Sequence, residues 1–406
     1  MNFEKWRARA EKRDVIYREK IHADEEREEV LPKKGIVDVP MLLITAALLL
    51  FGCVMVYSAS SIYAEQYHDD TTYFIARHLF FILAGVGVAA LAAAVCTPRF
   101  WKDWSYLIFG ISVVLLLLVP IIGVDLNSGA KRWLDLYFFT LQPSEIAKMA
   151  LVLTLARFMT THEKKILSEH RFGGSFKYGV LFPGLLIFTV VALVAIEKHI
   201  SGVMIIGMIG IAVMFLGGTK LRWIISVIGF IVGAGCLLIL VSEYAQTRVL
   251  TWWNIEDADP LGSAWQTLQG LMAIGSGGVF GTGLGNSRQK FGYVSQPQND
   301  FIYTIVCEEL GFIGAALVVL LFIAFVWRGF YIAKHLPDKC SALMVYGLSF
   351  KVALQVILNI AVVTNMMPNT GIALPFFSYG GTSLILQLLE VGIILSMSRY
   401  ASHRKI

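Results

Sequence analysis

Long uninterrupted stretches of apolar residues recur along almost the whole of this 406-residue chain, and they constrain its fold more than any other feature. They lie near 39–58, 74–95, 105–123, 142–160, 178–196, 200–217, 221–242, 300–327, 342–367 and 379–398. A helix needs about 20 residues to cross a hydrocarbon core of ~30 Å. Because the stretches are continuous and do not alternate with a period of two, they predict membrane-spanning helices rather than barrel strands.

The composition agrees with a polytopic membrane protein. Hydrophobic residues make up 56% of the chain and charged residues only 16%, whereas a soluble domain carries about 25% charged residues. We therefore predict an all-α fold of about ten transmembrane helices in one membrane domain, residues 37–400. A charged segment, 1–36, precedes this domain, and a short tail, 401–406, follows it. The five cysteines have no metal-ligand spacing, so no metal site is predicted.

The distribution of Lys and Arg predicts that both chain ends lie in the cytoplasm. With that orientation the cytoplasmic loops and C-terminal tail carry 14 Lys and Arg, and the N-terminal segment carries ten more. The opposite face carries six, which are Lys131, Arg132, Lys198, Arg248, Arg288 and Lys290. Because Lys and Arg accumulate in cytoplasmic loops, we expect an N-in, C-in topology, which requires an even number of spans.

The longest loop, residues 243–299, separates the seventh and eighth stretches and is predicted to be extracytoplasmic. It contains Trp252, Trp253 and Trp265, and indole rings favour the membrane–water interface. Its glycines within 275–286 superficially resemble a nucleotide-binding loop. No strand precedes them and no Gly-Lys-Ser/Thr follows, so we interpret them as a tight surface loop.

Two opposite charges stand near the outer start of the fourth stretch. Glu145 and Lys148 are three residues apart and therefore share one helix face. Ionisable groups within spans are costly and are functional hypotheses by default. Two interpretations remain open: a salt bridge within the helix that merely satisfies both charges, or a polar floor for a substrate.

Three further cations are expected on the outer face, where cations are otherwise scarce. Lys131 and Arg132 are adjacent in the loop before the fourth stretch, and Arg77 lies at the outer start of the second stretch. Guanidinium and ammonium groups donate charge-assisted hydrogen bonds to phosphate oxygens. As a set they suit an anionic head group such as a pyrophosphate, although each one alone could be an ordinary interfacial anchor.

Asp300 stands at the outer boundary of the eighth stretch, where it can meet both water and substrate. A carboxylate there could take a proton from an attacking hydroxyl, provided that its pKa is near the working pH. Helix N-capping is the alternative, since Asp is a favoured N-cap residue. Buried pairing between helices is expected for the deeper charges, because an unpaired buried charge is strongly destabilising; these are Glu308, Glu309, Lys351 and Glu390.

Several short motifs occur in order between residues 37 and 400. They are Val56-Tyr57-Ser58-Ala59-Ser60, Gly129-Ala130-Lys131-Arg132-Trp133, Gln142-Pro143-Ser144-Glu145 with Lys148, Ile274-Gly275-Ser276-Gly277-Gly278, Gly283-Leu284-Gly285-Asn286 with Gln289-Lys290, Asn299-Asp300-Phe301-Ile302, Glu308-Glu309-Leu310-Gly311, and Leu374-Pro375-Phe376-Phe377-Ser378-Tyr379-Gly380-Gly381-Thr382-Ser383. Together they resemble the SEDS family (shape, elongation, division and sporulation), whose members include FtsW, RodA and SpoVE. The charged N-terminus and the Tyr57–Ser61 segment are closer to FtsW than to RodA.

The resemblance implies a peptidoglycan glycosyltransferase that polymerises lipid II in the bacterial cytoplasmic (inner) membrane, with its active face outside. It implies a class B penicillin-binding protein and other divisome or elongasome membrane proteins as partners, and no nucleic acid. The family's essential aspartate corresponds to Asp300, and its Glu and Lys in the fourth span correspond to Glu145 and Lys148. The expected substrate-binding residues are Glu145, Lys148, Arg77, Lys131, Arg132, Gln142 and Ser144.

The expected reaction is a single inverting displacement. Asp300 deprotonates the sugar C4 hydroxyl of one lipid II, whose oxygen attacks C1 of the strand's terminal MurNAc as undecaprenyl pyrophosphate departs. The outer cations would stabilise the leaving group; no cofactor is assigned, and a divalent cation sharing this neutralisation is left open. One departure from the family is visible: Lys198 stands between Glu197 and His199 where the family often has proline.

Two other functions are weighed. A lipid II flippase or transporter would suit the mid-depth charges and the GxxxG-like pair Gly229 and Gly233. Against it, the candidate polar residues gather at the outer face and no inverted repeat is visible. A non-catalytic division scaffold would leave Asp300 and the outer cations without a role. The enzyme is therefore the favoured hypothesis.

Overall fold

A computed structural model describes residues 35–125, 130–137, 139–168, 174–241, 243–255 and 264–401. Its helices are α2 (Val39–His68), α3 (Tyr73–Val95), α4 (Pro98–Ile122), α5 (Pro143–Thr161), α6 (Glu163–Ile166), η2 (Lys177–Leu181), α7 (Phe182–Ile196), α8 (Ile200–Leu216), α9 (Leu221–Val241), α10 (Glu243–Trp253), α11 (Trp265–Gly277), α12 (Ile302–Lys334), α13 (Lys339–Val363) and α14 (Gly381–Ser398). The strands named within the described residues, β1 (Leu134–Asp135) and β2 (Thr140–Leu141), form an antiparallel pair.

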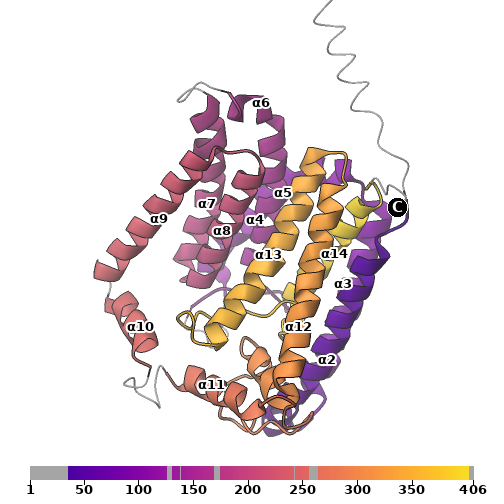
Figure 1. The fold of residues 1–406 in the computed structure, drawn as a ribbon, viewed down its shortest axis with the longest axis vertical. Coiled ribbons are helices and arrows are strands. Elements are labelled where there is room, and N and C mark those ends of the chain that lie inside the picture. The colour runs from indigo at the N-terminus through magenta and orange to yellow at the C-terminus, as the bar shows by residue number, and fades with distance from the viewer. Residues whose placement is uncertain are drawn as a thin grey trace, which may run out of the picture.

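The predicted all-α fold is confirmed. Each of the ten apolar stretches coincides with a helix, and the long helices other than α9 run side by side as one bundle, from which α9 diverges toward α10 (Figure 1). Within the described residues, seven helices are long and apolar enough to cross a membrane, and α8 is an additional, shorter apolar helix. The chain is therefore a multi-pass membrane protein.

The two ends of the described chain meet. The Gly35 amide donates to the Arg399 carbonyl oxygen at 2.7 Å, so residues 35 and 399 lie at the same end of the bundle. A chain that starts and finishes at one end must cross an even number of times, as the charge distribution requires. Figure 1 places α10 and α11 at the opposite end. Which end faces the cytoplasm stays a prediction.

Helix α5 lies at the centre of the bundle. Its buried residues include consecutive positions from Ala147 to Ala156 and therefore cover every side of the helix. A helix that is apolar all round is expected to be buried, and α4, α7, α8, α13 and α14 all pack around this one. Glu145 and Lys148 are consequently carried into the interior and need partners there.

Helix α12 is interrupted, although the sequence predicted a continuous span. Gly311 has a non-helical conformation, with φ 64° and ψ −165°, which glycine adopts without a steric penalty. The glycine-rich segment 278–285 packs into this break. The amides of Thr282 and Gly283 donate to the carbonyl oxygens of Glu308 and Glu309, each at 2.9 Å. The interpretation of the glycines within 275–286 as a tight surface loop is confirmed from Gly278 onward, whereas Gly275 and Gly277 belong to the end of helix α11.

Glu308 differs from expectation, because its side-chain partners come from the loop and not from another helix. It accepts from the Ser287 hydroxyl at 2.5 Å and the Arg288 amide at 2.8 Å. Glu309 has partners in both places: it forms a salt bridge with Lys290 of the loop at 3.0 Å and accepts from the Ser58 hydroxyl of α2 at 2.7 Å. These carboxylates fasten the loop to α12, which the loop reaches because its glycines allow a close approach.

Candidate active site

Four buried charged side chains from three helices form one ion-pair network. The Lys148 amino group lies 2.5 Å from Glu145 on α5, and the Lys351 amino group of α13 lies 2.6 Å from Glu390 of α14. Lys351 also lies 3.5 Å from the second oxygen of Glu145, which joins the two pairs. The expected pairing of Lys351 and Glu390 between helices is confirmed. Two ammonium groups and two carboxylates balance, as buried charges must.

The salt bridge within α5 therefore exists, and it leaves Lys148 poorly available to a ligand. Lys148 is 1% exposed and Glu145 is 7% exposed. Gln142 is the N-cap residue of α5 and makes no side-chain capping bond. Ser144 is fully buried, and its hydroxyl has no hydrogen-bond partner among the described residues. These four residues form a polar floor at the start of α5, with the charges already paired.

The turn between α7 and α8 lies above this floor. The guanidinium of Arg132 donates to the Lys198 carbonyl oxygen at 2.8 Å, so Arg132 and the turn hold each other. Lys198 has φ 53°, a conformation that proline cannot adopt because its ring holds φ near −65°. Lys198 thus permits a backbone at this turn that proline would exclude.

Two titratable residues of the turn have shifted pKa values. Burial lowers the pKa of His199 to about 4, and Lys148 and Arg132 add to the effect by electrostatic repulsion of the imidazolium. Burial raises the pKa of Glu197 to about 8, although Arg132 opposes the shift. Glu197 is 3% exposed, and neither of its carboxylate oxygens has a hydrogen-bond partner within the described part of the chain. The turn therefore presents unsatisfied acceptors beside cations.

Asp300 lies two residues before α12 and is partly buried. The N-cap position of α12 is Phe301, and no side-chain capping bond is made there, so Asp300 is not the N-cap residue. Burial raises the pKa of Asp300 to about 6 from its ordinary value of 3.8, although the backbone N–H groups of Asp300 and Phe301 oppose the shift. A carboxylate with this pKa can accept a proton near neutral pH.

The loop from Thr364 to Gly380 connects Asp300 with the α7–α8 turn. A side chain added at Gly371 would place its Cβ 3.4 Å from Asp300 Oδ2, so the loop backbone lies against the carboxylate. The preceding residue, Thr370, accepts a hydrogen bond from Ser201 at the start of α8. The sequence pointed to this loop only as a motif and gave no reason to place it in the site.

Asn359 of α13 is the other residue that sequence reasoning missed. Its side-chain amide donates to the Asp300 carbonyl oxygen at 2.7 Å and to the Ile372 carbonyl oxygen at 2.6 Å. An amide within an apolar span was a visible signal, since polar groups in such spans need partners. Its partners became evident only when α12, α13 and the following loop came together.

The remaining predicted cations, Arg77 and Lys131, are distributed around the same end of the bundle. Arg77 is exposed and lies over the Tyr73 ring at 4.6 Å. It also lies beside Tyr379, where it opposes the rise in the tyrosine pKa that burial causes. The Tyr379 amide donates to the Gln298 carbonyl oxygen at 2.8 Å, which links Arg77 to the segment that carries Asp300. Lys131 is exposed.

The structure therefore brings most predicted residues to one end of the bundle, in two groups. One group is the polar floor and turn, with Glu145, Lys148 and Arg132. The other is Asp300 with the loop from Thr364 to Gly380. Arg77 of α3 is linked to this group through Tyr379. A carboxylate able to accept a proton and cations able to stabilise an anion are the groups needed for general-base catalysis with an anionic leaving group.

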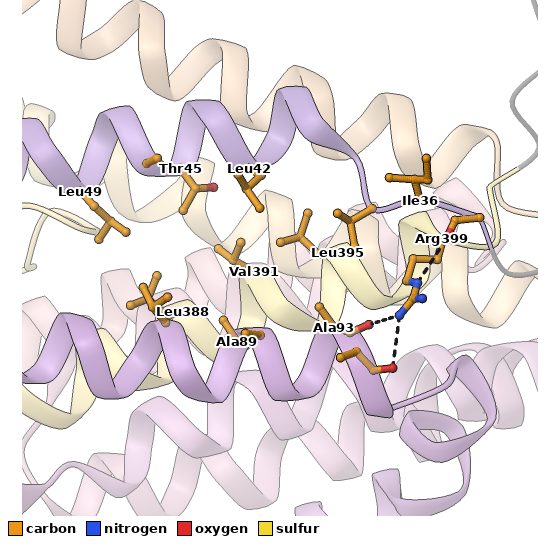
Figure 2. Close-up of a pocket in the computed structure, with 16 residues that line it drawn as sticks. Ile36, Leu42, Thr45, Leu49, Ala89, Ala93, Leu388, Val391, Leu395 and Arg399 are labelled. Atoms are coloured by element: carbon orange, nitrogen blue, oxygen red, sulfur yellow. Dashed lines mark hydrogen bonds between the residues drawn. The ribbon is translucent and has the colours of Figure 1, made fainter.

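A well-formed apolar groove lies elsewhere and is separate from this chemistry. It has a volume of about 670 Å³ and is formed by α2, α3 and α14 (Figure 2). Arg399 lies at one end of it, where its guanidinium donates to the carbonyl oxygens of Ala93 and Ala94. Because Arg399 is at the end of the bundle where the chain termini meet, the groove is remote from Asp300.

Comparison with protein families gives a match over nearly the whole membrane domain. The family model for FtsW, RodA and SpoVE, described as "Cell cycle protein", matches residues 39–403. Stage V sporulation protein E of Bacillus subtilis (strain 168) is 40% identical over 375 residues, which are 91% of this chain and 99% of that protein. A probable peptidoglycan glycosyltransferase FtsW of Trichlorobacter lovleyi is 35% identical, covering 89% of this chain and 93% of the relative.

Solved structures agree with this match. A chain from a peptidoglycan synthase complex, studied for its coordination of polymerization and crosslinking, superposes with a TM-score of 0.74 at 25% identity. The match covers 89% of this chain and 98% of that one. The rod shape determining protein RodA of Thermus thermophilus gives a TM-score of 0.67 at 25% identity, covering 92% and 100% of the two chains. The chain belongs to the FtsW/RodA/SpoVE family of cell cycle proteins.

Proposed function

We propose that this protein is a peptidoglycan glycosyltransferase that polymerises lipid II, with Asp300 as the general base. The observation that carries the assignment is the environment of Asp300, a partly buried carboxylate whose pKa is raised to about 6. It lies at the same end of the bundle as Arg77, Lys131 and Arg132, which are distributed around that end. Relatives named as probable peptidoglycan glycosyltransferases support the reaction class.

The proposed step is one displacement. Asp300 takes the proton from the C4 hydroxyl of an incoming lipid II, and that oxygen forms a bond to C1 of the MurNAc at the end of the growing strand. The bond from C1 to the pyrophosphate oxygen breaks, and undecaprenyl pyrophosphate leaves with the electron pair. The attack comes from the face opposite the leaving group, so the anomeric centre is inverted.

The cations have different parts in this proposal. Arg132 is partly exposed and Arg77 and Lys131 are exposed, so their side chains can reach a pyrophosphate and stabilise the charge that develops on it. Lys148 is buried and paired with Glu145, and we assign this pair, with Gln142 and Ser144, to the floor that shapes the substrate site. Omission of divalent cations from the assay tests whether a metal ion shares the neutralisation.

We place the active face outside the bacterial cytoplasmic membrane, because the Lys and Arg distribution puts the Asp300 end there. A class B penicillin-binding protein is the proposed partner, together with other divisome or elongasome proteins. The solved relative that is a chain of a peptidoglycan synthase complex supports an assembly of this kind.

The test uses purified full-length protein with fluorescent lipid II, alone and with the cognate penicillin-binding protein, in the presence of moenomycin to silence unrelated polymerases. Glycan ladders are expected with the native chain. They should disappear with Asp300→Ala and with Asp300→Asn, which keeps the shape of the side chain. Ladders of normal intensity from both variants would remove Asp300 from the role of base.

Other outcomes of this test would assign a different function to the protein. If no condition gives ladders, while lipid II moves across vesicle membranes that contain the protein, a flippase would take the place of the polymerase. If neither activity is measured although the penicillin-binding protein binds, the protein would be a scaffold.

A further inference from the structure

Asn359 is a buried amide that the proposed reaction does not use, and it is attached to the segment that carries Asp300. It lies one turn from the end of α13, and 1% of it is exposed. The two hydrogen bonds from its Nδ2 atom measure 2.7 Å and 2.6 Å and end on the carbonyl oxygens of Asp300 and Ile372. Its own carbonyl oxygen, Oδ1, has no hydrogen-bond partner in the part of the chain that the structure describes.

The two acceptors belong to two chain segments that meet at Asp300. One is the carbonyl oxygen of Asp300 itself, just before α12. The other belongs to Ile372, next to Gly371, whose backbone lies against Asp300 Oδ2. One planar amide group therefore joins the backbone of Asp300 to the loop beside its carboxylate.

We propose that Asn359 is a positioning residue that holds the Asp300 carboxylate in line with the attacking hydroxyl, by joining the Asp300 and Ile372 carbonyls through one side-chain amide. This inference rests on the proposed role of Asp300 as the base. Holding reacting groups in a near-attack geometry accounts for a large part of enzymatic rate enhancement, and a misplacement of about 1 Å can reduce the rate ~100-fold. Asn359 therefore acts on turnover, without touching the substrate.

The decisive variant is Asn359→Asp, which has nearly the same shape but, when ionised, donates no hydrogen bond. Its carboxylate would face two carbonyl oxygens and repel both. We expect kcat to fall ~10-fold to ~100-fold, whereas KM for lipid II should change less than about threefold. Because a carboxylate disfavours the ionisation of another nearby, the acid limb of the pH–rate profile should also move to higher pH.

Ser349→Ala is the matched control on the same helix. Ser349 is fully buried and its hydroxyl has no hydrogen-bond partner, so its replacement should leave kcat, KM and the pH profile unchanged. Gly371→Ala is a second variant that disturbs the position of the Asp300 carboxylate, because it adds a Cβ beside Asp300 Oδ2 at a residue with φ 65°. It should lower kcat with little change in KM, even if Asn359→Asp proves too unstable to purify.

Full kcat in both Asn359→Asp and Gly371→Ala would overturn the proposal. So would a loss of activity that comes entirely from a rise in KM or from a lower fraction of folded protein, with an unchanged pH profile, because that pattern indicates a purely structural amide. Failure of the proposed function is recognised separately, since active Asp300→Ala protein would remove the base whatever Asn359 does.

Discussion

Two effects act in opposite directions on the pKa of Asp300. Burial raises its pKa to about 6, and the N–H groups at the start of α12 limit that rise. The carboxylate is therefore mostly ionised at pH 7 and remains basic enough to accept a proton.

This environment predicts how activity depends on pH. Below pH 6 Asp300 becomes protonated and cannot act as a base, so kcat/KM for glycan polymerisation should fall as pH decreases through about 6. The decline should approach tenfold for each pH unit, since one proton is involved. Rates measured between pH 5 and 8 with fluorescent lipid II provide the test. A flat profile over this range would contradict the assignment.

The buried ion pairs predict a stability effect at the residue scale. Lys351→Met leaves Glu390 without its 2.6 Å partner and removes one of the two lysines beside Glu145. Breaking a buried pair in this way is expected to destabilise the protein by about 3–5 kcal/mol. The midpoint of thermal unfolding in detergent should fall markedly. The double variant Lys351→Met/Glu390→Gln should recover part of the loss, because it removes the uncompensated charge; no recovery would count against the pairing.

At the scale of elements, the break in α12 and the glycine-rich segment form a single unit. Gly281 and Gly311 both have positive φ, and a Cβ on either one would overlap the backbone of the other segment. Glu308 and Glu309 complete the attachment through Ser287 and Lys290. The helix break thus explains why segment 278–285 is held against α12.

Gly311→Ala should loosen this attachment. The substitution places a side chain in a left-handed conformation and against the backbone of Val279 and Gly281, so segment 278–290 should become more susceptible to limited proteolysis. Gly229→Ala is the control, because no atom lies within 4 Å of a Cβ at that position in α9 and alanine favours a helix by about 1 kcal/mol. Equal protease resistance in both variants would show that the loop does not depend on the break.

The open space around Gly229 also bears on the flippase hypothesis. Gly229 and Gly233 were considered as a helix-packing pair, but a Cβ at either position would meet no atom within 4 Å among the described residues. The pair therefore does not bring another described helix into close contact. This removes one of the features that had favoured moving spans.

At the scale of the whole molecule, the positions of the chain ends make the topology testable. Cysteines introduced at Phe280 and at Lys164, both exposed, lie in loops that the charge distribution places on opposite sides of the membrane. In a cysteine-free background, an impermeant thiol reagent added to spheroplasts should label Phe280→Cys. Lys164→Cys should react only after lysis. The reverse pattern would invert the orientation and place Asp300 in the cytoplasm.

The sequence alone determined the membrane class, the positions of the ten apolar helices and the family, because apolar length and short ordered motifs are local properties of the chain. It also identified Asp300, Glu145 and Lys148 as residues that need an explanation, since charges near or within apolar stretches are exceptional. Only the tertiary structure decided their partners. The joining of Glu145 to Lys351, the break at Gly311 and the bridge from Asn359 to Asp300 each depend on contacts between segments distant in the chain, and such contacts exist only after the helices have packed.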